Sequence, residues 1–142
     1  MSLTLFCASF VEPQEPNTFP YKLLWKYLVH NPLQSAVAEG DSLHFVASTE
    51  GRLSALRKSD GVRIWYRRDL GPVWAPPVVW EEQLIVADAW GLVRSLRVDT
   101  GGENWSFKRT GGGRCVLVQA GSLLYVSAAD GWLYALESDG RE

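Results

Sequence analysis

The chain has 142 residues, about the length of one domain, and 46% of them are hydrophobic. Its formal net charge of −2 at pH 7 gives no sign of the concentrated positive charge with which nucleic-acid-binding proteins contact phosphates, so no nucleic-acid partner is expected. No run approaches the roughly 18 apolar residues of a membrane-spanning helix, and the first residues lack the basic segment of a signal peptide. We predict neither a membrane span nor a signal peptide, and the compartment stays open.

Residues 1–20 are expected to form an extended arm or linker. Three prolines lie between residues 11 and 20, and proline both restricts the backbone and removes a hydrogen-bond donor. The part of the chain that carries the fold therefore begins near residue 21.

Residues 21–142 consist of one unit that recurs every 40 residues. Trp25, Trp65 and Trp105 keep this interval. Three glycines keep it as well: Gly51, Gly91 and Gly131. A period of about 40 with four short strand patterns per unit is typical of β-propeller blades. We therefore predict an all-β fold of about three blade equivalents, each of four antiparallel strands. This is a partial propeller, because closed rings hold roughly four to eight blades, and we expect the three repeats to be a fragment of a larger propeller protein.

The predicted elements follow one another along the chain, and no segment shows a helical period. In order they are a strand of the fourth type at 21–28, a blade at 33–68, a blade at 73–108 and an incomplete blade at 114–140. Alternation of apolar and polar residues places the strands of the first blade at about 36–39, 43–47, 52–57 and 63–66. Glycine is expected at the tight turns because it tolerates positive φ. The glycines before the fourth strands are Gly61, Gly101 and Gly140.

The turn before each fourth strand carries a spaced motif of a small residue, a glycine and a tryptophan. Its members are Ala55, Gly61 and Trp65 in the first copy, Ser95, Gly101 and Trp105 in the second, and Ala135 and Gly140 in the third. The motif resembles the tryptophan-docking motif of the quinoprotein-type, or PQQ-like, propeller repeat, A-x-D-x-x-T-G-x-x-x-W. Arg57 and Arg97 replace the Asp of that motif, Glu137 lies nearest to it in the third copy, and the Thr survives only as Thr100.

The resemblance covers about residues 22–140 and implies what the family is known for. The family includes quinoprotein alcohol dehydrogenases, the outer-membrane assembly lipoprotein and sensor domains of some bacterial Ser/Thr kinases, and its members are often extracytoplasmic. Its dehydrogenases hold pyrroloquinoline quinone with adjacent cysteines and a calcium site of Glu, Asn and Asp. Cys7 and Cys115 are not adjacent, and the sequence identifies no calcium ligands. We therefore expect no quinone cofactor, no metal and no enzymatic activity.

The repeat tryptophans are predicted to join the blades rather than to bind a ligand. A tryptophan on the outermost strand can cover the seam to the next blade, where it buries roughly 150–250 Å² while its N–H reaches a backbone carbonyl. This role is assigned to Trp25, Trp65 and Trp105. Three other tryptophans break the repeat and either pack between blades or mark a protein-binding face: Trp80, Trp90 and Trp132.

Three residues just before the innermost strands form the candidate ligand site. Gln34, Trp74 and Arg114 stand in register at one mouth of the predicted channel. An indole face and a guanidinium fork together suit a planar anion. The alternative is that Trp74 simply plugs the channel.

The two ends of the repeat are complementary. The segment around Trp25 resembles a fourth strand without its first three, and the blade at 114–140 has three strands without a fourth. Because three blades alone would strain a ring and an unpaired edge invites aggregation, we expect closure between two chains. If these residues are the whole chain, the predicted assembly is a homodimer in which each chain lends its Trp25 strand to the last blade of the other.

Two functions are consistent with these patterns. The first is a non-catalytic propeller module that acts as a protein-interaction scaffold. The alternative is a ligand-sensing domain of a larger enzyme or Ser/Thr kinase, with a quinone-like ligand in its channel. The two differ in which residues matter, because only the second depends on the channel-mouth residues.

Overall fold

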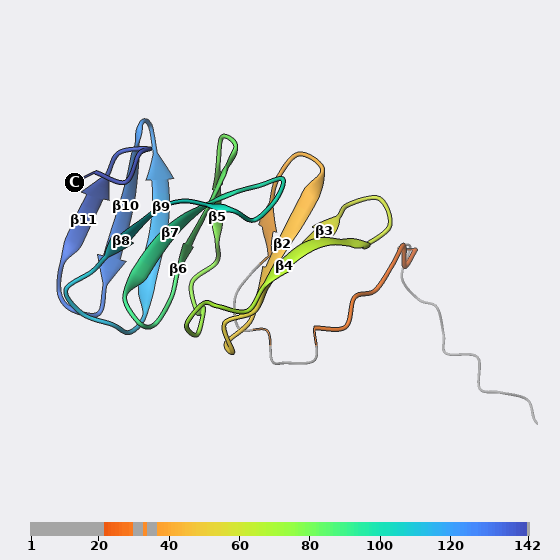
Figure 1. Cartoon of the computed structure of the whole chain (residues 1–142), viewed down its shortest axis with the longest axis horizontal. Helices are drawn as coiled ribbons and strands as arrows, with labels where there is room; N and C mark the ends of the chain where they lie inside the picture. Colours follow the sequence, from red (N-terminus) through yellow and green to blue (C-terminus); the bar gives the residue numbers. More distant parts are fainter. Residues whose placement is uncertain (1–21, 30–32, 34–36, 142) are drawn as a thin grey trace, which may run out of the picture.

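The computed structural model describes residues 22–29, 33 and 37–141 and contains three antiparallel sheets (Figure 1). The sheets stand side by side in chain order, and no helix occurs among the described residues. The predicted all-β fold and partial propeller are therefore confirmed. The predicted arm at residues 1–20 lies outside the described residues.

The first two sheets have four strands each and the third has three. The strands of the first sheet are β1 (Ala38–Glu39), β2 (Leu43–Ala47), β3 (Leu53–Arg57) and β4 (Arg63–Arg67). Those of the second are β5 (Val78–Trp80), β6 (Gln83–Ala87), β7 (Leu92–Arg97) and β8 (Glu103–Lys108). Those of the third are β9 (Cys115–Ala120), β10 (Leu123–Ala128) and β11 (Leu133–Leu136). β5 contacts both β1 and β9, so the first strands of all three sheets gather where a propeller has its axis.

The 40-residue period of the sequence reappears in the strand pairing. Trp65 lies opposite Ala55, and Trp105 lies opposite Ser95. In both sheets the register shifts directly after that pair, toward Leu56 and Leu96, as in a β-bulge. The predicted strand ranges of the first blade agree with the observed ones to within two residues.

Two hydrophobic cores lie between the sheets. Strand β6 contributes to both, because alternate residues of a strand face opposite sides. Leu84 packs with Phe45 in the core between the first and second sheets, whereas Ile85 packs with Leu124 in the core between the second and third. All four side chains are fully buried, and burial of an apolar side chain of this size contributes roughly 1.5–3 kcal/mol. The contacts between sheets are therefore a main source of stability.

The hairpins that join second and third strands explain one set of repeated glycines. Gly51, Gly91 and Gly131 all have positive φ, of 76°, 91° and 87°. A Cβ at Gly51 would overlap the carbonyl oxygen of Leu70, and one at Gly91 would lie 2.7 Å from the carbonyl oxygen of Gly111. At Gly51 and Gly91 the glycine is thus required both by the turn and by the linker that crosses it, whereas nothing lies within 4 Å of a Cβ at Gly131.

The segment 22–29 differs from its prediction. The sequence predicts a fourth-type strand at 21–28, but the described part of this segment pairs with no strand and has no strand assignment. It lies beside the first sheet, at the opposite end of the row of sheets from β11 (Figure 1). A strand needs a ladder partner, and its predicted partner is on the third sheet.

Candidate functional site

The repeat tryptophans all make the same contact with the next unit. The indole Nε1–H of Trp65 donates to the carbonyl oxygen of Val98 at 2.9 Å, and that of Trp105 donates to Ser138 at 2.8 Å. Trp25 donates in the same way to Lys58 at 2.9 Å. Each ring lies on a turn glycine, where an added Cβ would come within 2.6 Å of an indole carbon: Gly61, Gly101 and Gly140. The motif residues therefore join one sheet to the next.

The arginines that replace the motif's Asp support the same turns in another way. Arg57 donates to the carboxylate of Asp60 at 2.8 Å, and Arg97 donates to the hydroxyl of Thr100 at 3.1 Å. Asp60 in turn accepts the N–H of Val62 at 3.0 Å, and this N–H is the main cause that lowers the pKa of the Asp60 carboxyl. The turn keeps its side-chain acceptor, so the departure from the motif leaves the tryptophan contacts intact.

The third sheet exposes a face that the first two sheets bury. Leu53, Val93 and Leu133 occupy equivalent positions, and their exposed fractions are 0%, 0% and 66%. The exposed apolar residues on one side of β9 and β11 form the open face of the third sheet: Val116, Val118 and Leu133. The side chains that would cover this face in a longer row of sheets are absent among the described residues, because β9–β11 form the last sheet (Figure 1).

The edge of the third sheet is open as well. β11 pairs with β10 on one side, whereas its counterparts β3 and β7 also pair with a fourth strand. Within the described residues, no strand takes that place beside β11. An apolar face next to a free strand edge is a surface suited to bind another polypeptide.

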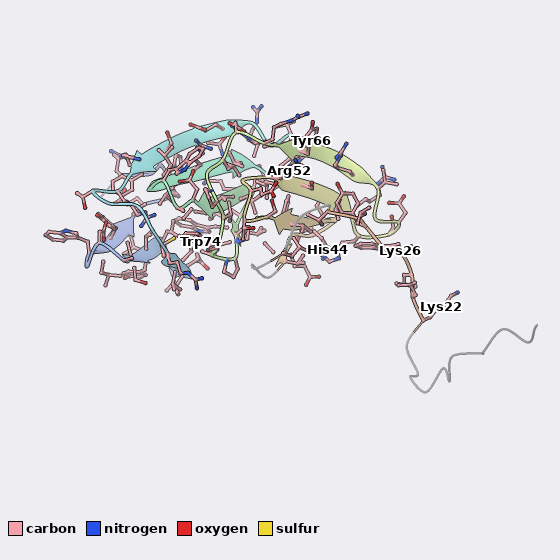
Figure 2. All side chains as sticks on the ribbon, turned by 90° about the horizontal axis from the view of Figure 1, so that it is seen from below. Lys22, Lys26, His44, Arg52, Tyr66 and Trp74 are labelled. Carbon is pink, nitrogen blue, oxygen red and sulfur yellow. The ribbon has the colours of Figure 1, made fainter. Side chains whose placement is uncertain are left out.

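The structure brings two of the three predicted channel-mouth residues together. The guanidinium carbon of Arg114 lies 5.4 Å from the centroid of the Trp74 ring, within the range of a cation–π contact. Both side chains line a shallow hollow of about 410 Å³ that also includes Cys115 and Ser127; Figure 2 labels Trp74. Gln34 lies outside the described residues. The assignment of these residues as a ligand site stays a prediction.

The hollow does not fit the quinone site that the resemblance implies. None of its lining residues is a carboxylate, although a calcium ion prefers carboxylate and carbonyl oxygens. Cys115 is free, and burial raises the pKa of its thiol, against the opposing charge of Arg109. Across residues 22–29, 33 and 37–141, no group of three or more His, Cys, Asp or Glu side chains is placed to hold a metal ion. The expectation that no quinone is bound stays a prediction.

Two buried charges were not predicted from the sequence. Asp88 accepts the N–H groups of Gly71 at 3.1 Å, of Trp90 at 3.0 Å and of Leu92 at 3.1 Å. Arg109, which is 1% exposed, donates to the backbone oxygen of Asp88 at 2.9 Å. These contacts fasten the linker regions on both sides of the second sheet to its β6–β7 hairpin. The sequence held one indication of this role: Asp88 breaks the repeat, because the equivalent residues of the other two units are Ser48 and Ala128.

The three tryptophans outside the repeat have different surroundings. Trp80 is buried in the core between the second and third sheets. Trp90 and Trp132 are largely exposed at the hairpins of the second and third sheets, and the Trp90 ring packs on Gly71. Of the two predicted alternatives, Trp80 therefore packs between sheets, whereas Trp90 and Trp132 are exposed.

Several solved structures have a fold similar to that of this chain. BamB from Moraxella catarrhalis has a similar structure, with a TM-score of 0.75 and 21% identity over 83% of this chain and 38% of that chain. A computationally designed protein, Ika4, has a TM-score of 0.77 and 13% identity over 86% of this chain and 76% of that chain. Quinohemoprotein alcohol dehydrogenase ADHIIG from Pseudomonas putida HK5 has a TM-score of 0.69 and 17% identity over 85% of this chain and 22% of that chain. At these identities the TM-scores show a shared fold alone.

The chain spans less than half the length of the Moraxella protein that it matches. No curated protein sequence matches it. Among the described residues, no helix has the length and apolar character needed to cross a membrane. A family model described as "Outer membrane protein assembly factor BamB" matches residues 22–142, and the chain therefore belongs to this family of PQQ-like propeller repeats.

Proposed function

We propose that the chain is a non-catalytic propeller module that binds another protein through the open face and edge of its third sheet. The observation that carries this proposal is the contrast between Leu53, fully buried, and Leu133, 66% exposed at the equivalent position. A partner of matching chemistry presents an extended strand to β11 and apolar side chains to the open face. Addition of a strand supplies main-chain hydrogen bonds, and the apolar contacts supply burial.

The family supports a role in protein interaction. The matching model is described as an outer membrane protein assembly factor, and a protein of that description acts on other proteins. The alcohol dehydrogenase neighbour is related by fold, but the hollow at Trp74 lacks the carboxylates of a calcium–quinone site. We therefore favour binding over catalysis.

The test compares two surface variants of the same chain as bait in affinity capture. Leu133→Lys with Val118→Lys places two charges on the open face, where both side chains are already exposed. Val62→Lys is the matched control, because Val62 is 49% exposed but lies in the turn before β4. We expect a specific partner to be retained by the control and lost by the double variant, and to bind the purified chain directly. A partner set that is the same for both variants contradicts the proposal.

A second candidate function rests on the Arg114–Trp74 contact. In this alternative the channel mouth holds a small planar carboxylate, stacked on the indole and paired with the guanidinium. Trp74→Ala with Arg114→Ala would then abolish a ligand-induced rise in Tm measured against a panel of aromatic carboxylates. Under the first proposal, the variant with Trp74→Ala and Arg114→Ala still binds its protein partner.

A further inference from the structure

Two parts of this chain, β11 and the segment 22–28, lack a strand to pair with among the described residues. In the described structure β11 lacks a fourth strand beside it, and the segment 22–28 has the sequence pattern of a fourth strand. β11 is paired on one side only among the described residues. The segment 22–28 makes the tryptophan contact of a fourth strand, through Trp25 and the carbonyl oxygen of Lys58, but no described strand pairs with it. The two edges lie at opposite ends of the row of sheets (Figure 1), so within one chain they do not meet.

The segment 22–28 already has the side-chain alternation of a fourth strand. Trp25 and Tyr27 are half-buried, whereas Lys26 between them is exposed. The same alternation occurs in β4, where Trp65 is half-buried and Tyr66 is exposed. Tyr27 faces the first sheet, with its hydroxyl 3.4 Å from Ser54 Oγ, and Figure 2 shows Lys26 near this sheet and Lys22 farther out along the chain. One side of the segment therefore contacts the first sheet without any ladder.

The pairing register follows from the two complete sheets. Trp65 lies opposite Ala55 and Trp105 lies opposite Ser95. The same 40-residue offset sets Trp25 opposite Ala135. The pairs Leu53 with Arg67 and Val93 with Phe107 likewise set Tyr27 opposite Leu133.

The faces at the two ends are also complementary in polarity. Phe45 and Leu84 share the first core, and Ile85 and Leu124 share the second. Phe45, Ile85 and Tyr125 are equivalent positions, and so are His44, Leu84 and Leu124. The next pair in this series is therefore Tyr125 of one chain with His44 of another. Nδ1 of His44 is buried and has no hydrogen-bond partner in the described structure, and the described residues likewise provide no partner for the Tyr125 hydroxyl. Polar side chains therefore occupy this pair of positions at the two ends of the series, where the two cores between sheets have apolar ones.

We infer that the occupant of the open third sheet is a second copy of this chain, whose residues 22–28 add to β11 as its fourth strand. The inference rests on the binding surface of the proposed function, the open face and edge of the third sheet, and names its occupant. The contact continues an interface already repeated twice in the chain, between the first and second and between the second and third sheets. Two copies joined reciprocally give a ring with twice the three sheets of one chain, within the roughly four to eight blades of closed propellers.

The first experiment measures the mass of the purified chain by light scattering coupled to size exclusion. We expect twice the 15.9 kDa of one chain. Leu133→Lys with Val118→Lys is expected to return the mass to that of one chain, and the Val62→Lys control is expected to keep the doubled mass. A single-chain mass for the unmodified protein at all concentrations up to about 100 μM, or an unchanged doubled mass for the double variant, overturns the inference.

A disulfide-trapping experiment tests the register itself. Tyr27→Cys with Leu133→Cys, in a background of Cys7→Ser and Cys115→Ser, places two thiols on directly opposite residues, whose Cβ atoms are about 4.5–5.5 Å apart in antiparallel pairs. The matched control is Lys26→Cys with Leu133→Cys, because neighbouring residues of a strand point to opposite faces. We expect covalent dimers under mild oxidation in the first variant at least tenfold more than in the control. Equal trapping in the two variants overturns the inference.

The two proposals fail in distinguishable ways. A single-chain mass together with capture of another protein that depends on Leu133 and Val118 removes the second-copy inference and leaves the binding function. A doubled mass with matched trapping, but with the same captured set for all variants, supports the second copy and removes the function of binding other proteins.

Discussion

The junction between the first and second sheets and the open face of the third sheet are made from the same repeat positions, yet they differ in burial. Leu53 is fully buried at the junction, and Leu133 is 66% exposed at the open face. Ala55 and Ser95 are likewise fully buried, whereas the equivalent Ala135 is exposed. The comparison teaches that burial in this fold comes from the neighbouring sheet rather than from the sheet itself. A repeat unit is therefore stable to the extent that both of its faces are covered.

The largest expected difference in stability is between alanine variants of the equivalent residues Leu53 and Leu133. Leu53→Ala is expected to lower the free energy of unfolding by about 2–5 kcal/mol, because it leaves a cavity in a packed core. Leu133→Ala is expected to change the stability of the single chain by less than about 0.5 kcal/mol, as for other exposed positions. Urea denaturation at low protein concentration measures both. A loss at Leu133 that grows with protein concentration would show that a second copy covers this residue, and equal losses at low concentration would contradict the comparison.

Alanine variants of two hairpin glycines show how much the contact with a crossing linker affects stability. Gly91→Ala and Gly131→Ala both force an alanine into positive φ, which costs about 1–2 kcal/mol. Only Gly91→Ala also drives a Cβ toward the carbonyl oxygen of Gly111, since nothing lies within 4 Å of a Cβ at Gly131. We expect Gly91→Ala to be the more destabilising variant by at least about 1 kcal/mol, by the typical cost of overpacking. Thermal and urea unfolding provide the measurement, and a reversed order would contradict the linker contact.

The hairpin between β5 and β6 offers a stabilising change. Glu81 has a φ of 56°, whereas the equivalent position in the third sheet is Gly121, with a φ of 60°. Glu81→Gly removes a strain of about 1–2 kcal/mol and adds about 0.5–1 kcal/mol of backbone entropy to the unfolded chain. The expected net gain is about 0.5 kcal/mol, seen as a higher urea midpoint. Glu82→Gly is the matched control, because Glu82 has no positive φ, and this variant is expected to lose stability.

The smallest expected effect is a pH dependence at the third hairpin. The N–H of Trp132 is the main cause that lowers the pKa of Asp130 below its usual 3.8, and the hydroxyl of Tyr134 and the N–H of Gly111 act in the same direction. Because the folded-state pKa is depressed, this stabilisation is present above about pH 4 and is lost as the pH falls through the folded pKa. We expect Asp130→Asn to flatten the fall in urea midpoint between pH 5 and pH 2.5. Asp99→Asn changes one charge elsewhere on the chain and serves as the control, and an equal flattening by both would exclude Asp130 as the cause.

Much of the architecture was predictable because the repeat carries it locally. The tryptophan and glycine series predict where fourth strands and turns lie, and the structure places Trp65 and Gly101 in contact across the seam. The predicted strand at 21–28 did not form a ladder among the described residues, because local alternation cannot supply a partner strand. The proximity of Trp74 and Arg114 was also predictable, because their 40-residue separation places them in register. The contacts of Asp88 and Arg109 were not, because they break the repeat and form only when the linkers pack on the second sheet.

The sequence by itself determined the class of fold, the number of repeat units and the residues that join them. It did so because strand alternation, positive-φ glycines and docking tryptophans act within one unit or between one unit and the next. Only the tertiary structure decided that Asp88 and Arg109 fasten the linkers of the second sheet, and that the third sheet exposes an apolar face beside the free edge that the sequence predicts. Burial depends on which sheets stand beside one another, and that arrangement arises from contacts between residues far apart in the chain.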